Sequence, residues 1–130
     1  MSDAFDANVL IGAARPAGPS AVDQDVILRS EERIGSVILL PEVLTKPLRI
    51  GELTELSSLN ELLGTFDLKP VDEEIADAAV TLGAKYRLKS PDAIHLATAV
   101  VWGAERFYTH NTKDFGDHIT EIDVVVPGAG

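Results

Sequence analysis

The stretch of sequence that decides the fold is Ser90-Pro91-Asp92-Ala93-Ile94-His95-Leu96-Ala97-Thr98-Ala99. Ser90 is a favoured helix cap, Pro91 suits the first helical position, and Asp92 would meet the positive end of the helix dipole. The residues that follow are small and apolar, which is typical of a helix packed closely against a sheet. We therefore expect the dipole to lower the pKa of Asp92 and the helix to hold its carboxylate rigidly.

Short apolar runs on both sides of this helix predict the strands of that sheet. They alternate mostly with helical patterns, which is the order expected of an α/β fold with a parallel sheet. The predicted strands are residues 4–5, 37–40, 66–68, 107–108 and 122–126.

Further helices are indicated by their start signals and by the spacing of apolar residues. A helix over residues 20–33 is predicted because Ser20 and Asp23 stand at the spacing of a capping box. Asp72 can cap another helix, whose apolar face would be Ile75, Ala78, Ala79, Leu82 and Tyr86. A third has apolar residues at helical spacing: Leu53, Leu56, Leu59 and Leu63. Residues 14–19 are rich in Pro and Gly and predict a loop.

The composition indicates one globular domain spanning residues 1–130. Hydrophobic residues make up 45% and charged residues 25%, which argues against disorder. The absence of cysteine excludes disulfides and thiolate-bound zinc, so any metal must be held by oxygen or imidazole. We see no signal peptide and no apolar run near the ~18 residues of a membrane span, so we expect a cytoplasmic protein without a membrane partner.

Acidic residues stand where a parallel sheet usually carries its binding crevice, beyond the carboxyl ends of the strands. Asp6, Glu42 and Asp114 each follow a predicted strand, and Asp92 begins the helix just before one. Mg²⁺ prefers such oxygen ligands, and divalent cations assist phosphodiester cleavage. We therefore expect these acids to converge on one site.

Each of these acids also has an ordinary structural interpretation. Asp6 could simply cap a helix over the apolar residues after it. Glu42 could form an exposed helical pair with Lys46, in a helix that opens at Pro41 and that Pro47 should kink or end.

Asp114 lies in the polar turn Thr109-His110-Asn111-Thr112-Lys113-Asp114, a composition that loops favour for local reasons. Phe115 is its expected core anchor. His95 is more often a packing residue than a ligand when it stands alone on a helix, so we do not assign it to a metal.

Together these segments resemble the PIN domain, and within it the VapC ribonuclease toxins. The matching stretches are Asp6-Ala7-Asn8-Val9-Leu10-Ile11, Ser36 with Glu42 six residues later, residues 90–99, and Thr109-His110-Asn111 leading to Asp114-Phe115. They are in register over nearly the whole chain, which makes the combination specific although each part is weak.

The resemblance implies a three-layer α/β/α sandwich with a parallel sheet, and an endoribonuclease whose acids bind Mg²⁺ or Mn²⁺. By position, Asp6, Glu42, Asp92 and Asp114 take the acidic roles, while Asn111 and Thr109 would orient water or the scissile phosphate. It also implies an RNA substrate, a homodimer, and a toxin neutralised by a VapB-like antitoxin that wraps its surface and reaches toward the active site.

This chain departs from the family pattern at two positions. Ala7 stands where many members have Thr or Ser, and Asn111 stands where many have an acid. One charge of a second metal site is thus missing, and we predict a single cation completed by substrate phosphate.

The formal net charge of −10 is unusual for a protein that binds RNA. Bound Mg²⁺ would neutralise part of the acidic cluster. Six of the 11 basic residues also flank the candidate ligands in sequence: Lys46, Arg49, Lys85, Arg87, Lys89 and Lys113.

Two other functional classes remain open. A catalytically weak binding module acting through an antitoxin complex would keep the fold, but the retained acids argue against it. A response-regulator-like receiver would need an acidic pair after its first strand and a Lys after its fifth, where this chain has Pro127-Gly128.

Overall fold

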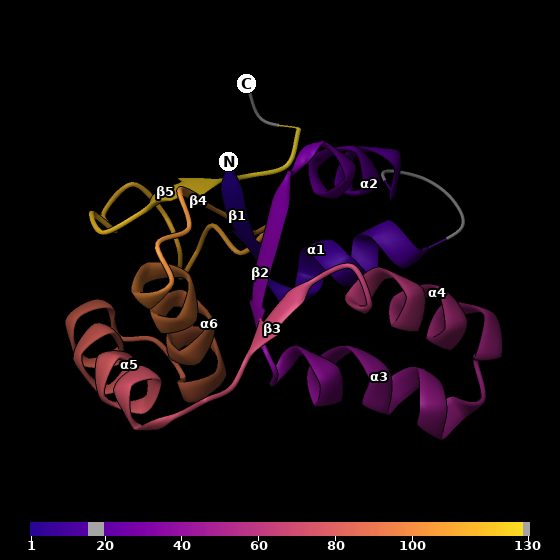
Figure 1. Cartoon of the computed structure of the whole chain (residues 1–130), viewed down its shortest axis with the longest axis horizontal. Helices are drawn as coiled ribbons and strands as arrows, with labels where there is room; N and C mark the ends of the chain where they lie inside the picture. The colour runs from indigo at the N-terminus through magenta and orange to yellow at the C-terminus, as the bar shows by residue number, and fades with distance from the viewer. Residues whose placement is uncertain (16–19, 129–130) are drawn as a thin grey trace.

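The computed structural model describes residues 1–15 and 20–128, and its centre is a sheet covered by helices on both faces (Figure 1). The sheet has five strands, all parallel, in the order β3-β2-β1-β4-β5. The strands are β1 (Ser2–Phe5), β2 (Glu32–Ser36), β3 (Asp67–Lys69), β4 (Arg106–Tyr108) and β5 (Asp123–Val125). The helices are α1 (Ala7–Ala14), α2 (Ser20–Arg29), α3 (Leu39–Ile50), α4 (Leu53–Leu63), α5 (Glu73–Tyr86) and α6 (Ser90–Val101).

The helices form two layers, with α5 and α6 on one face of the sheet and α1 to α4 on the other (Figure 1). Side chains alternate along the central strands, as the pleat requires. Ala4 and Phe107 pack in the core under α5 and α6, whereas Phe5 and Tyr108 pack in the core on the opposite face. The predicted three-layer α/β/α architecture is therefore confirmed.

The strand order reverses at β1. The chain passes from β1 to β2 and β3 on one side, then returns to place β4 and β5 on the other side. In such sheets the crevice for ligands lies beyond the carboxyl ends of the strands where the order reverses. Here that position falls between the ends of β1 and β4, which are adjacent strands.

The predicted strand at residues 37–40 is wrong, because β2 is Glu32–Ser36 and α3 begins at Leu39. The helix predicted over residues 20–33 correspondingly ends at Arg29. Pairing with both neighbouring strands places β2 there, and Gly35 allows close packing: a Cβ at this position would lie 2.6 Å from Leu39 Cδ1. The apolar run marks the start of the helix after the strand, since Leu39 is fully buried.

The other helix predictions hold with shifted ends. Asp72 caps α5, accepting a hydrogen bond from the Ile75 backbone N–H at 2.9 Å, and the predicted apolar face packs in the core. Of the two outcomes predicted for Pro47, a kink or an end, the end is excluded, because helix α3 runs for three more residues to Ile50. The predicted loop at residues 14–19 lies mostly outside the described residues, and Ala14 belongs to α1. No helix in the described ranges is long and apolar enough to cross a membrane.

Candidate functional site

Asp6 stands at the carboxyl end of β1, beside the end of β4. Its backbone N–H donates to the Tyr108 carbonyl at 2.9 Å, which ties the two strand ends together. Its carboxylate caps α1 through the Ala7 N–H at 2.9 Å, and also accepts from Thr109 Oγ1 at 2.8 Å and Asn8 Nδ2 at 3.2 Å. Asp6 therefore serves as a helix cap through Oδ1, while its Oδ2 accepts from Thr109 and Asn8.

Thr109 and Asn111 hold carboxylates in this structure. Thr109 is fully buried, and its hydroxyl donates to Asp6 while accepting the Asn111 backbone N–H at 3.0 Å. The Asn111 amide donates to Asp114 Oδ2 at 3.0 Å, and its carbonyl oxygen accepts the Asp114 backbone N–H at 3.3 Å. Phe115 is fully buried against Phe107, which confirms it as the anchor of this turn.

Asn8 belongs to the same group, although no role is predicted for it from the sequence. Its Nδ2 donates to Asp6 and its Oδ1 accepts the His110 backbone N–H at 3.1 Å. The signal available was its spacing, because a polar residue two positions after Asp6 in the first turn of an apolar helix needs a partner nearby.

Asp92 lies in the first turn of α6, as expected, but its pKa is raised and not lowered. Burial is the largest cause, followed by the negative charges of Asp6 and Asp114; Glu42 adds to the shift and His95 opposes it. These effects outweigh the helix dipole. Within the described residues the Asp92 carboxylate has no hydrogen-bond partner, so no donor offsets the effects of burial and of the neighbouring charges. The predicted cap is also shifted by one residue, because Ser90 is already helical.

Glu42 projects from α3 toward α6, where its Oε1 is hydrogen-bonded to His95 Nε2. The expected ion pair of Glu42 with Lys46 is not among those formed by the described residues. His95 is buried, consistent with a packing role, but its contact with Glu42 was not foreseen. No local pattern could have indicated it, because the two residues are 53 positions apart.

A PIN-domain family model matches residues 4–118, which include every one of these side chains. The chain belongs to the PIN-domain family. No curated protein matches this PIN domain in sequence.

Solved structures with the same fold include several toxin–antitoxin complexes. A chain of a toxin–antitoxin complex from Klebsiella pneumoniae is 30% identical with a TM-score of 0.80, and the match covers 96% of this PIN domain and 97% of that chain. VapBC from Salmonella typhimurium bound to DNA gives 16% identity, a TM-score of 0.78, and coverage of 97% and 98%. For VapBC2 from Rickettsia felis bound to a promoter DNA fragment, the identity is 15% and the TM-score is 0.77. The match covers 97% of this PIN domain and 98% of that chain. The two VapBC structures, at these identities, show the same fold as this PIN domain.

The donor set of this PIN domain fits a hard divalent cation, because its four candidate ligands are all carboxylates and share one end of the sheet. Within residues 1–15 and 20–128, however, no three His, Asp or Glu side chains form a group that could hold a metal as they stand. Glu42 is held by His95, and Asp114 by Asn111. A cation would therefore require side-chain rotation in this cluster.

Asp23 is a second residue whose role differs from the one expected. It is buried in α2 and accepts a hydrogen bond from His110 Nε2 at 2.6 Å, so its carboxylate connects α2 to the turn after β4. The predicted capping box with Ser20 is not described, because the structure describes only the backbone of Ser20, which begins α2.

The basic residues are divided between the site and other contacts. Lys46 and Arg15 line a cavity of about 300 Å³ together with Glu42. Lys85, in contrast, forms an ion pair with Glu121 at 2.9 Å. Only part of the basic set that flanks the acids in sequence is therefore available near them in space.

Proposed function

We propose that this PIN domain is an endoribonuclease, the toxin of a type II VapBC-like toxin–antitoxin pair, with Mg²⁺ or Mn²⁺ held by Asp6, Glu42, Asp92 and Asp114. The observation that carries the proposal is that the carboxylates of Asp6, Glu42 and Asp114, from three other segments, lie near Asp92 at the switch point of the sheet, where their charges add to burial in raising its pKa. Partial burial and neighbouring negative charges both disfavour the ionised form of Asp92, and a bound cation would offset both effects.

Each residue of the site has a distinct part in this proposal. Thr109 and Asn8 fix Asp6, and Asn111 fixes Asp114, so the chain itself orients two of the candidate ligands. When bound, the cation would stabilise the negative charge that develops on the scissile phosphate. Because Asn111 replaces an acid and carries no charge, we propose one cation and not two.

The test is cleavage of single-stranded RNA by the purified chain, with Mg²⁺ or Mn²⁺ and then with EDTA. We expect cleavage only with the cation, and loss of cleavage in Asp114→Asn. The control is Asp117→Asn, which removes one charge from an exposed residue of the same turn. Cleavage in EDTA would overturn the proposal. A chain that binds its antitoxin but neither binds cation nor cleaves RNA would instead be the alternative binding module.

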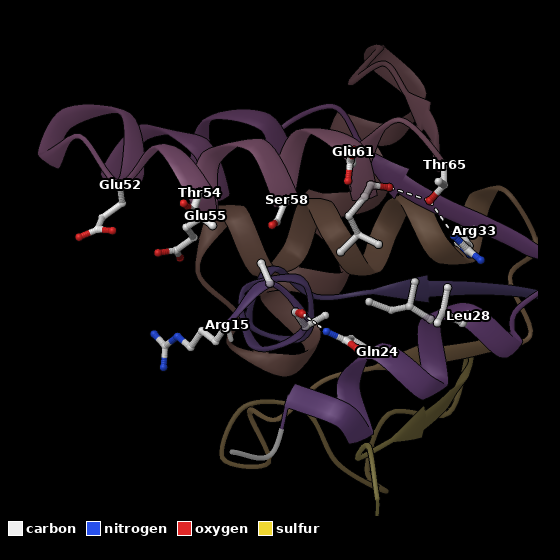
Figure 2. A pocket seen from close by; sticks show the side chains of 14 residues that line it. Arg15, Gln24, Leu28, Arg33, Glu52, Thr54, Glu55, Ser58, Glu61 and Thr65 are labelled. Carbon is white, nitrogen blue, oxygen red and sulfur yellow. Dashed lines mark hydrogen bonds between the residues drawn. The ribbon is translucent and has the colours of Figure 1, made fainter. Parts of the chain in front are cut away.

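The antitoxin is the partner that we propose for a groove between α1, α2 and α4 (Figure 2). The groove has a volume of about 540 Å³, and its walls include Ile27, Leu28 and Leu62. Its residues Arg15, Glu52 and Glu55 also line the smaller cavity that contains Glu42. A segment lying along the groove would therefore come next to the candidate metal ligands, which supports inhibition by direct coverage.

Leu28→Glu tests this placement, because Leu28 is 68% exposed and the change should leave folding intact. We expect it to weaken binding of the co-expressed cognate antitoxin. Val80→Glu is the matched control, since Val80 is 71% exposed on α5, across the sheet. Equal binding by both variants would remove the groove from the interface. The homodimer implied by the family remains a prediction, which light scattering would test.

A further inference from the structure

His95 makes a polar contact between the two helical layers. It lies on α6, one turn after Asp92, while Glu42 lies on α3, and these helices cover opposite faces of the sheet (Figure 1). The side chain of His95 is 2% exposed, whereas that of Glu42 is 32% exposed. A buried imidazole is thus directed at a carboxylate at the open edge of the acidic cluster.

Glu42 is the candidate ligand that most needs such support. Asp6 accepts bonds from three groups, and Asp114 is held by Asn111, but among the described residues the Glu42 carboxylate bonds only to His95. A glutamate side chain has three rotatable bonds, and fixing them costs conformational entropy. Repulsion by the other carboxylates would also direct a free Glu42 side chain away from the cluster and into water.

We propose that His95 is a positioning residue that holds Glu42 in place as a metal ligand. The inference rests on the proposed function and extends it to a residue outside the ligand set. With Nε2–H donating to Oε1, the second carboxylate oxygen, Oε2, remains available for a cation. The imidazole nitrogen that faces the cluster is then occupied by Glu42, so His95 acts through that carboxylate and is not itself a ligand.

The first experiment is calorimetric titration of the purified chain with Mn²⁺. Loss of a hydrogen bond that orients a metal ligand typically weakens metal affinity about 10–100-fold, so we expect that loss in His95→Leu. His95→Gln keeps a side-chain N–H donor and should retain most of the affinity. Thr98→Val is the control, because Thr98 is equally buried one turn further along α6 but, among the described residues, its hydroxyl bonds only to the Ile94 carbonyl. It should bind Mn²⁺ as the unchanged chain does.

A double-variant cycle separates positioning from general packing. If His95 acts through Glu42, then His95→Leu should have no further effect on Mn²⁺ affinity in a Glu42→Ala background. An equal loss in both backgrounds would overturn the inference, and so would unchanged affinity in His95→Leu. No Mn²⁺ binding by the unchanged chain would instead overturn the proposed function itself.

A metal-free measurement checks the contact even if His95→Leu does not fold. In ¹⁵N-resolved spectra of the histidine side chains, Glu42→Ala should shift the Nε2 resonance of His95. It should leave that of His118, an exposed histidine near Tyr86, unchanged. An unmoved His95 resonance in Glu42→Ala would show that the two side chains do not interact in solution, and would overturn the inference.

Discussion

Individual acids in the cluster are stabilised to different extents. Asp6 accepts hydrogen bonds from a backbone N–H, an amide and a buried hydroxyl, so its carboxylate is well supplied with donors. Asp92 has no such partner among the described residues, and burial together with the charges of Asp6 and Asp114 disfavours its ionised form. The same kind of side chain is therefore a source of stability at one position and a cost at the other.

Substitutions of these two acids should consequently have opposite effects on stability. In EDTA, Asp92→Asn should leave the melting temperature unchanged or raise it, because it removes a half-buried charge that its neighbours repel. Asp6→Ala should lower the free energy of unfolding by about 1–3 kcal/mol, because it removes a helix cap and the acceptor of the buried Thr109 hydroxyl. Both variants should lose RNA cleavage. Full RNA cleavage by Asp92→Asn, measured at a temperature at which this variant is folded, would exclude Asp92 from the site.

Helices α1 and α2 approach each other closely at Gly12, which lies beside the carboxylate of Asp23. A Cβ at position 12 would lie 1.9 Å from Asp23 Oδ2. Asp23 cannot move away freely, since it is buried and its other oxygen accepts from His110 in the turn after β4. The packing of two helices is thus linked to the turn that carries Thr109 and Asn111.

Gly12→Ala should therefore destabilise the fold by about 1–3 kcal/mol, the usual cost of overpacking. In an exposed helix, by contrast, replacing glycine with alanine is expected to raise the stability of the fold. The substitution should become neutral or stabilising in an Asp23→Ala background, where the clash is absent. Chemical denaturation of the four chains measures both effects, and a stable Gly12→Ala single variant would show that Asp23 can move.

The C-terminal segment is attached to α5 by Glu121. Tyr86 Oη donates to its Oε1 at 2.5 Å, and Lys85 Nζ donates to its Oε2 at 2.9 Å. The Tyr86 hydroxyl, followed by Lys85, lowers the pKa of Glu121 from 4.5 to about 2. This contact lies outside the acidic cluster and so reports on the fold independently of metal.

The pH dependence of stability should show this contact. Because the folded pKa of Glu121 is below the unfolded value, its ionised form stabilises the fold above about pH 4.5, and that contribution is lost as the pH falls toward about 2. Glu121→Gln should therefore be less stable than the unchanged chain at neutral pH, and the difference should shrink on acidification. Tyr86→Phe should remove part of the stabilisation that the ionised Glu121 carboxylate provides. A constant difference across this range would mean that the carboxylate is not held in solution.

At the scale of the whole molecule, charge opposes the proposed substrate. The chain carries a formal net charge of −10, and four of its acids lie at the proposed site. RNA is a polyanion, so without cations the long-range interaction is repulsive and only local basic residues such as Arg15 and Lys46 would favour binding.

RNA binding should accordingly depend on divalent cation. We expect single-stranded RNA labelled with a fluorophore to bind weakly in EDTA, and more tightly when Ca²⁺, an oxygen-preferring cation, is added at constant ionic strength. Asp114→Asn should lose most of that gain, while Asp117→Asn should keep it. Equal anisotropy curves with and without Ca²⁺ would separate RNA binding from the acidic cluster.

Local sequence patterns were sufficient to predict the layer architecture and to select the candidate acids. Alternating strand and helix patterns produce a parallel α/β sheet, and the polar residues after strands of such a sheet share one edge. Asp6, Asp92 and Asp114 could thus be selected without coordinates, and Asp72 could be identified as a cap from its neighbours alone. These features depend on contacts within a few residues or on strand direction, which local patterns record.

Tertiary structure alone decided the features that depend on distant neighbours. Strand β2 was not predicted, because its first residues are polar. It is a strand because it pairs with β1 and β3, and its own composition does not indicate one. The pKa of Asp92 rises although the local dipole would lower it, since burial and charges from other segments dominate. The partners of Glu42 and Asp23 are histidines 53 and 87 residues away. Electrostatics and hydrogen bonding act through space, and only the folded chain brings these groups within reach of one another.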